Sequence, residues 1–439
     1  MRQEKLSELL DISIGRTPSR NEPSYWGKGH RWVSIRDLSS KIVTETKEQI
    51  TNLAVKDARC KIVKKGTLLF SFKLTIGKMA FAGCDLFTNE AIAAFAIKDE
   101  KELNPEFLYY ALQSATYGGS NQAVMGKTLN SKSLAEIEIP LPSLDDQIRI
   151  AHLLGKVEGL IAQRKQHLQQ LDDLLKSVFL EMFGDPVRNE KSWVVKPLQS
   201  VTSKIGSGAT PTGGNEAYKS EGISLIRSMN VHDGKFVYKD LAFIDEVQAN
   251  KLKNVVVEEH DVLLNITGAS VCRCAIVPKA ILPARVNQHV AIIRPKTGEL
   301  NPKYLAAMFI SNSYKTFLLK IARINGATRE ALTKDQLEKL GICKPPIELQ
   351  NQFATIVEKT DAIKSSYQQS LTDLESLYGA LSQQAFKGEL DLSRVALPAA
   401  PIEGESPVTA GVPAPIATPV IELPETDLLL PAMHVLNET

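Results

Sequence analysis

Two sets of polar and basic residues, one in each half of the chain, carry the side chains best suited to binding chemistry. Arginine, lysine, asparagine and glutamine can hydrogen-bond to base edges in pairs, and serine, threonine and lysine commonly contact phosphates. Taken singly, each residue is more often a solvated loop side chain, but two recurring groups predict DNA binding. The first set is Arg16, Thr17, Arg20, Ser34, Arg36, Lys73, Thr75, Lys78, Gln122 and Lys127. The second set is Thr210, Arg227, Ser228, Asn230, Asn265, Thr267, Arg273, Gln288, Arg323, Asn325 and Arg329.

A methyltransferase-like tetrapeptide occurs twice, as Asn104-Pro105-Glu106-Phe107 and as Asn301-Pro302-Lys303-Tyr304. It resembles the Asn-Pro-Pro-Phe/Tyr motif with which amino-group DNA methyltransferases hold a flipped base. Neither copy follows a glycine-rich loop for a methyl donor, and each precedes an amphipathic run. We therefore interpret the two asparagines as helix N-caps followed by proline at the first helical position.

No pattern in the sequence predicts catalysis or a metal site. We find no Ser/His/Asp arrangement, and no Gly-Lys-Ser/Thr follows Gly206-Ser207-Gly208 as a phosphate loop requires. The five cysteines are scattered, and Cys272 and Cys274 lack a second pair or a nearby histidine, so we expect reduced thiols. No apolar run reaches the ~18 residues of a membrane span, and no secretory segment follows Met1. We expect a cytoplasmic protein without membrane attachment.

The two residue sets occupy equivalent places in an internal repeat. Gly15-Arg16-Thr17-Pro18 recurs as Gly208-Ala209-Thr210-Pro211, and Asn89-Glu90-Ala91 recurs as Asn287-Gln288-His289. Framework positions match while most loop residues differ, which indicates two binding surfaces of one kind with different targets. The Gly-x-Thr-Pro turns could present their side chains to a ligand or could only shape a loop.

A long amphipathic run follows each copy of the repeat. From Leu154 to Met182, apolar residues recur every three or four positions, which is typical of a helix that buries a narrow seam. The run from Ile347 to Phe386 aligns with it but has Thr360 and Lys364 at seam positions. We predict that the two helices pack antiparallel on each other. The alternative is that each helix packs along its own globular segment.

The predicted organisation has five parts and belongs to the α/β (α+β) class, with two similar globular domains in tandem. The parts are a globular domain at 1–143, a long helix at 144–184, a second globular domain at 185–346, a second long helix at 347–388 and a disordered Pro/Ala-rich tail at 389–439. The 439 residues are enough for domains that each bury a core.

The tail differs from the rest in pattern and charge. After Leu392 the helical and strand periods stop, and the last 47 residues hold eight prolines. The stretch from Val420 to Leu430 could be a docking motif, or the tail could be passive. From Ser393 onward six acidic residues face one basic residue, so the remainder is more basic than the total charge of +2 indicates. That balance is compatible with a polyanionic partner.

The duplicated order of these motifs resembles the specificity subunit of type I restriction-modification enzymes. The resemblance rests on Gly15-Arg16-Thr17-Pro18-Ser19, the segment from Trp32 to Asp37, the Ile139-Pro140-Leu141-Pro142 lead to Gln147, and the Phe183-Gly184-Asp185 exit. It implies that each globular domain is a target recognition domain that reads one half of a bipartite, asymmetric DNA site. It also implies that the long helices form an antiparallel coiled coil that sets the spacer and docks methyltransferase subunits.

The resemblance further implies a subunit without catalysis or a cofactor of its own. Its partners would be double-stranded DNA, two methyltransferase subunits that use S-adenosylmethionine, and restriction or translocase subunits. A proline-rich acidic tail is not usual in that family. A function of another class also fits the pattern, namely a coiled-coil scaffold whose globular domains bind protein partners; salt-dependent DNA binding distinguishes the two.

Overall fold

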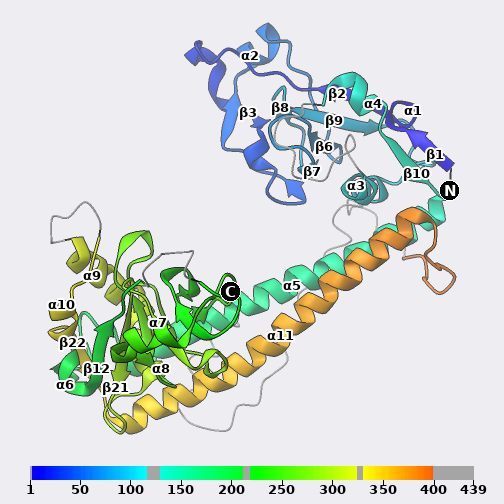
Figure 1. Cartoon of the computed structure of the whole chain (residues 1–439). Coiled ribbons are helices and arrows are strands. Elements are labelled where there is room, and N and C mark those ends of the chain that lie inside the picture. Colours follow the sequence, from blue (N-terminus) through cyan, green and yellow to red (C-terminus); the bar gives the residue numbers. More distant parts are fainter. Residues whose placement is uncertain (1, 116–128, 211–217, 324–329, 399–439) are drawn as a thin grey trace. The chain divides into compact units, whose positions relative to one another are not determined.

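The computed structural model describes residues 2–115, 129–210, 218–323 and 330–398 (Figure 1). These residues form two compact units. The first combines the chain up to Gln166 with the chain from Gln368 onward, and the second runs from His167 to Tyr367. The predicted sites Gln122, Lys127, Asn325 and Arg329 lie outside the described residues.

The first unit has a five-stranded sheet in the order β2-β9-β6-β7-β4, a three-stranded sheet β5-β3-β8, and the pair β1-β10. Its strands are β1 (Arg2–Lys5), β2 (Leu10–Ile14), β3 (Trp26–Val33), β4 (Ile42–Val43), β5 (Glu48–Ile50), β6 (Leu68–Ser71), β7 (Met79–Ala82), β8 (Phe87–Thr88), β9 (Ile92–Ile97) and β10 (Glu138–Leu141). Its short helices are α1 (Leu6–Leu9), α2 (Asn52–Asp57), α3 (Pro105–Ser114) and α4 (Ser131–Ala135).

The central strands of this sheet are apolar except for the buried Ser71 of β6, because both of their faces are covered. In β6, Leu68 and Phe70 belong to one buried cluster, whereas Leu69 belongs to another on the opposite side. This is the consequence of the two-residue side-chain period of a strand. The helix α3 and the start of the first long helix supply much of the first cluster.

The second unit has two four-stranded sheets, β12-β21-β18-β19 and β16-β13-β20-β17, and the pairs β14-β15 and β11-β22. Its strands are β11 (Val194–Pro197), β12 (Thr202–Ser207), β13 (Ile223–Ile226), β14 (Val231–His232), β15 (Lys235–Phe236), β16 (Ala242–Ile244), β17 (Val256–Val257), β18 (Val262–Asn265), β19 (Cys274–Ile276), β20 (Ala284–Val286), β21 (Val290–Pro295) and β22 (Gly341–Lys344). Its short helices are α6 (Leu198–Val201), α7 (Glu246–Lys251), α8 (Pro302–Ile310), α9 (Asn312–Arg323) and α10 (Lys334–Glu338).

Strand pairing confirms the internal repeat. The antiparallel series β2-β9-β6-β7 corresponds to β12-β21-β18-β19, and the parallel pair β3-β8 corresponds to β13-β20. The pair β1-β10, which precedes the first long helix, corresponds to β11-β22 before the second. The mixed class and the tandem arrangement of two similar domains are therefore as the sequence predicts.

The long helices are α5 (Leu144–Phe183) and α11 (Ile347–Lys387), and they run side by side (Figure 1). In the second unit the ring of Phe353 lies 5.5 Å from that of Phe183, and Lys364 Nζ lies 2.5 Å from Asp172 Oδ1. In the first unit Lys165 pairs with Glu375 at 3.0 Å. These partners run in opposite directions along the two helices, which confirms the antiparallel pairing.

The ends of both long helices also pack against the globular cores. Phe183 contacts Tyr304 of α8 with ring centroids 4.6 Å apart, and Phe386 contacts Phe107 of α3 at 5.7 Å. The alternative prediction, that each helix packs along a globular segment, therefore describes the helix ends. Each compact unit contains the start of one long helix and the end of the other.

The short helices after the tetrapeptides have the predicted caps. Asn104 Oδ1 accepts the backbone N–H of Phe107 at 3.0 Å, and Asn301 Oδ1 accepts that of Lys303 at 2.9 Å. In both cases proline occupies the first helical position. The tetrapeptides are therefore helix starts, as interpreted from the sequence.

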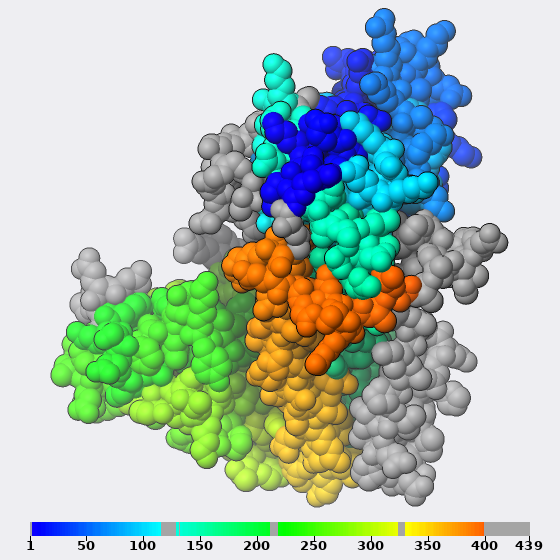
Figure 2. All heavy atoms as spheres, turned by 90° about the vertical axis from the view of Figure 1, so that its right-hand side faces the viewer, coloured from blue at the N-terminus to red at the C-terminus, as the bar shows by residue number. Residues whose placement is uncertain are grey.

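The segment that follows α11 returns to α5. Arg149 Nε donates to the backbone oxygen of Val395 at 2.9 Å, and Leu390 and Leu392 pack on the core of the first unit. In Figure 2 this orange segment lies against the start of α5. The sequence places residues 389–398 in a disordered tail, but Leu390 and Leu392 reach an apolar cluster. The rest of the predicted tail, with Val420 to Leu430, lies outside the described residues.

Candidate nucleic-acid interface

In the first unit three loops meet at one end of the strands β2, β9 and β6 of the main sheet. The backbone N–H of Arg16, after β2, donates to Thr88 O at 2.8 Å, and that of Phe72, after β6, donates to Ala91 O at 3.0 Å. The Thr17 hydroxyl donates to the carboxylate of Glu90. The turn after β2, the turn before β9 and the β6–β7 loop therefore form one continuous surface.

The second unit builds the same junction from different side chains. The backbone N–H of Gly208 donates to Asn287 O at 3.1 Å, and that of Ile266 donates to His289 O at 3.0 Å. The Thr210 hydroxyl donates to Gln288 Oε1 where the first unit has a carboxylate. The junction is thus a repeated backbone arrangement that carries variable polar groups.

In each unit, glycine is required where the turn with the Gly-x-Thr-Pro sequence touches the backbone of a neighbouring segment. A Cβ at Gly15 would lie 2.1 Å from Thr88 O, and a Cβ at Gly208 would lie 1.7 Å from Val286 O. Both glycines therefore serve the close approach of two backbones. The Gly-x-Thr-Pro turns shape the loop through glycine and threonine, and they also leave Arg16 exposed on the surface.

A series of hydrogen-bonded polar side chains extends this junction in the second unit. His289 Nδ1 lies 2.5 Å from Thr267 Oγ1, and its Nε2 lies 3.1 Å from Gln288 Nε2. With the Thr210–Gln288 bond, four side chains from three loops are joined. Sequence reasoning missed His289 and Glu90 as site residues. Both lie in the repeated segments that begin at Asn89 and Asn287, so a position-by-position comparison of the two copies could have found them.

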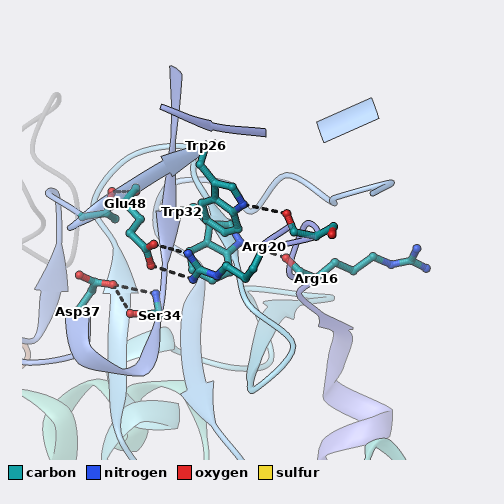
Figure 3. Close-up of polar contacts among 9 residues, drawn as sticks. Arg16, Arg20, Trp26, Trp32, Ser34, Asp37 and Glu48 are labelled. Atoms are coloured by element: carbon teal, nitrogen blue, oxygen red, sulfur yellow. Dashed lines mark hydrogen bonds and ion pairs between the residues drawn. The ribbon is translucent and has the colours of Figure 1, made fainter. Parts of the chain in front are cut away.

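Arg20 is held by two tryptophans and an acid (Figure 3). Its guanidinium carbon lies 3.8 Å from the ring centroid of Trp26 and 5.1 Å from that of Trp32, and its Nη2 donates to Glu48 Oε2 at 3.0 Å. The hydrogen bond between Arg20 and Glu48 lowers the pKa of the Glu48 carboxyl, and the same bond raises the pKa of the Arg20 guanidinium. The structure therefore gives Arg20 an intramolecular partner while its side chain stays on the exposed surface.

Arg16 borders an open pocket of about 630 Å³. Its Nη1 donates to Ala58 O at 3.3 Å, and the lining also includes Glu90 and Arg59. Arg59 is an exposed cation that sequence reasoning missed, because it stands outside the repeated motifs. With Asp57 the lining holds two arginines and two carboxylates, so the pocket can accept a group that has both donors and acceptors.

The remaining described sites of the first unit divide by role. Ser34 Oγ donates to Asp37 Oδ2 at 2.7 Å, so its hydroxyl caps a local turn, whereas Arg36 is exposed. In the β6–β7 loop, Thr75 and Lys78 are exposed and Lys73 is half-buried. The Lys73 ammonium lies 5.4 Å from the ring centroid of Phe72.

Two asparagines of the second unit are fully buried, which corrects their predicted role. Asn230 Nδ2 donates to Val237 O at 2.9 Å, and Asn265 Nδ2 donates to Ser228 O at 2.8 Å. Their amides hold loop backbone in place, so they do not face a ligand in this structure. Backbone carbonyls inside a loop need such donors, because a buried polar group without a partner is costly.

The arginines of the second unit are partly engaged. Arg227 donates to Asp240 O and lies 5.2 Å from the ring centroid of Tyr218. Arg323, at the exposed end of α9, donates from Nε to Glu330 Oε1 at 2.6 Å. Arg273 and Ser228 are half-buried, whereas Gln288 is exposed. Among the described arginines of the second interface, Arg227 and Arg323 thus have partners within the chain.

The polar side chains of these surfaces are hydrogen-bonding and charged groups, which suit the binding of a ligand. Within the described residues no group of three or more His, Cys, Asp or Glu side chains is placed to hold a metal ion. The cysteines are unpaired, and burial raises the pKa of the Cys272 thiol to about 12, which keeps it unreactive. None of the described helices is long and apolar enough to span a membrane.

The amino-acid sequence is similar to a known protein family and to individual members of it. Residues 2–172 and 190–375 match the family model described as the type I restriction modification DNA specificity domain. The type I restriction enzyme MjaIX specificity subunit of Methanocaldococcus jannaschii is 26% identical over 412 residues, which cover 88% of this chain and 92% of the relative. The EcoBI specificity subunit of Escherichia coli is 24% identical over 334 residues, 69% of each chain.

Solved structures show the same fold. The S subunit of a type I restriction-modification system from M. genitalium matches with a TM-score of 0.54 at 16% identity, over 88% of this chain and 96% of that one. A chain from a structure on assembly and conformational transition of the type I R-M system matches with a TM-score of 0.56 at 17% identity, over 89% and 98%.

Proposed function

This chain belongs to the type I restriction modification DNA specificity domain family, and from that premise we propose that it is the sequence-specific DNA-binding subunit of a type I restriction-modification complex. Each globular domain reads one half of a bipartite, asymmetric site. The chain contributes recognition, and catalysis belongs to its partner subunits. Its compartment is the cytoplasm, where its DNA partner lies.

The observation that carries this proposal is the repeated three-loop junction with different side chains in its two copies. Thr17 bonds to Glu90 in the first unit, whereas Thr210 bonds to Gln288 in the second. A carboxylate accepts from the amino group of cytosine, and a glutamine amide can bond to adenine in pairs. One backbone frame with different groups at the same place suits two readers of different sequences.

Affinity comes mainly from cations around each junction. Arg16, Arg36, Arg59 and Lys78 are exposed in the first unit. Cations at such positions neutralise phosphates and release counterions, so binding weakens steeply as salt rises. The buried asparagines Asn230 and Asn265 support the loops of the second unit from within.

The pair of long helices sets the spacer between half-sites and docks the partners. Two antiparallel helices resist bending better than a flexible linker, so the distance between the readers is fixed in base pairs. The partners are two methyltransferase subunits, which bind S-adenosylmethionine, and restriction or translocase subunits. The chain is the part that tells this assembly where to act.

The test is selection from a library of random DNA duplexes with the full chain, alone and with a methyltransferase subunit of the same system. We expect enrichment of two short sequence blocks separated by a fixed number of unspecified base pairs. Binding of the enriched duplex should weaken with log salt at a slope of about −0.9 for each phosphate neutralised. Absence of enrichment and of salt-dependent binding in both conditions would favour the scaffold that binds proteins.

A further inference from the structure

Leu74 is the most exposed large hydrophobic side chain among the described residues. It lies in the loop between β6 and β7 with 94% of its surface exposed, and its backbone φ is +62°. That left-handed conformation brings the Cβ of a leucine too close to the backbone, so glycine or asparagine usually occupies it. The loop therefore keeps an apolar side chain in water on a strained backbone. Strain of this kind, once observed, points to a functional use.

The loop that carries Leu74 is closed by hydrogen bonds. Ser71, which is fully buried, donates from Oγ to Thr75 O at 2.5 Å and accepts the backbone N–H of Lys78 at 2.9 Å. The backbone N–H of Gly77 donates to Ser71 O at 2.9 Å. These bonds fix the base of the loop, so Leu74 is presented outward by a defined backbone.

The surroundings of Leu74 favour duplex DNA as the ligand. Lys73 and Lys78 flank it in the same loop, and the base of the loop joins the Asn89–Glu90 turn through the Phe72–Ala91 backbone bond. A loop that carries an exposed apolar side chain and two lysines complements a base step and its neighbouring phosphates. Leucine is one of the side chains that proteins insert between base pairs from the minor groove.

The second unit has no such tip among its described residues. In the loop between β18 and β19 the residues with positive φ are Gly268, at +77°, which has no side chain, and Cys272, at +67°, whose side chain is fully buried. A short 3-10 helix, η6 (Gly268–Ser270), replaces the exposed apolar residue. The exposed leucine is thus a property of one reader and is not required by the shared frame.

We propose that Leu74 is a wedge that enters the duplex between two base pairs of the half-site read by the first unit, while Lys73 and Lys78 contact the flanking phosphates. The inserted side chain unstacks and kinks that step. It makes the first half-site depend on how easily the step deforms as well as on its base edges. This inference rests on the proposed DNA-binding function.

The experiment uses the full chain with a methyltransferase subunit and the duplex enriched from the random library. The fluorescent base 2-aminopurine is placed at each position of the two half-sites in turn, because its emission rises when it is unstacked. The variants are Leu74→Ala, which removes the wedge, and Leu74→Gly, which also relieves the backbone. Leu53→Ala is the matched control, since Leu53 is an exposed leucine of the same unit, 48% exposed on α2.

Apart from a base that the methyltransferase subunit itself flips, we expect the wild type to raise the emission at one step, and that step lies in the first half-site. Both Leu74 variants should lose this rise and bind that duplex on the order of tenfold more weakly, whereas Leu53→Ala should keep both. Leu74→Gly should melt at the same or a higher temperature than the wild type, which shows that the loss is not unfolding.

Other outcomes distinguish a failure of the Leu74 wedge from a failure of the proposed DNA-binding function. If the wild type binds the enriched duplex without unstacking any base, or if Leu74→Ala binds and unstacks as the wild type does, the wedge is wrong and the proposed function stands. If Leu74→Ala instead loses the methyltransferase subunit, the loop is a protein contact and the wedge is again wrong. If no duplex is enriched, both proposals fall.

Discussion

Gln147, at the start of α5, accepts the backbone N–H of Asn104 through its Oε1 at 2.8 Å. Its Nε2 donates to Glu102 O at 2.8 Å and to Pro142 O at 3.0 Å, and the side chain is fully buried. In the second unit Gln350, at the start of α11, accepts the backbone N–H of Asn301 at 2.8 Å. One amide thus ties the cap of a short helix to the start of a long one in each unit.

Gln147→Leu tests this connection. Leucine has nearly the same volume but leaves one N–H and two carbonyls, all partly buried, without this partner, so we expect a loss of about 2–3 kcal/mol in the free energy of unfolding. Urea denaturation measures it. The control is Gln169→Leu, whose glutamine bonds to Asp173 on the exposed side of α5; a cost above about 1 kcal/mol there would show that any glutamine on α5 matters equally.

Phe353→Ala tests the packing of the long helices in the second unit. Phe353 is 1% exposed and contacts the rings of Phe179 and Phe183. Removing a buried ring from such a cluster costs about 3–5 kcal/mol. The comparison is Leu377→Ala on the same helix, where the leucine is 47% exposed and the change should stay within about 1 kcal/mol. Equal costs at the two positions would contradict the buried seam.

Gly208→Ala tests the junction of the second interface. The added Cβ would meet Val286 O, so the turn must move, whereas a Cβ at Gly206 meets nothing within 4 Å. We expect Gly208→Ala to reduce selectivity for the second half-site on the order of tenfold and to leave the first half-site unchanged. Gly206→Ala should behave as the wild type. Sequencing of enriched random duplexes reads both half-sites at once, and equal loss at both half-sites would point to general unfolding.

The Arg20–Glu48 pair predicts a pH effect on the stability of the first unit. The pKa of Glu48 lies below its ordinary value of 4.5, chiefly because Arg20 donates to it. A depressed carboxyl pKa stabilises the fold above the unfolded pKa, and this stability is lost as the pH falls through the folded pKa. The pair is partly exposed, so solvent screening limits it to about 1 kcal/mol or less.

Glu48→Gln should therefore lower stability near pH 7 and lose that difference below about pH 4. Chemical denaturation of both proteins at a series of pH values measures this. A difference that is the same at pH 7 and at pH 3 would mean that Glu48 acts through packing and not through its charge.

Periodicity predicted the largest features of the fold. The three-and-four spacing from Leu154 to Met182 indicated α5, and the repeated motifs indicated two similar domains. The break in the second seam was visible as Lys364, but its reason required coordinates, because the partner, Asp172, stands far away in the sequence. Strand order also required coordinates, since each pairing joins distant segments.

The candidate site was less accessible to sequence reasoning, and the misses have physical causes. Asn230 and Asn265 have side chains that could read bases, but their burial follows from loop closure, which residue type does not show. Leucine is usually a buried residue type, so nothing in the sequence distinguishes Leu74. Only its exposure and positive φ set it apart.

The most direct test of two independent readers is a domain exchange. Residues 1–143 are replaced by the corresponding domain of another member of the family, and the duplexes enriched from a random library by the wild type and the chimera are sequenced. The account predicts that one sequence block changes while the other block and the spacer stay the same. A chimera that alters both blocks, or neither, would contradict it.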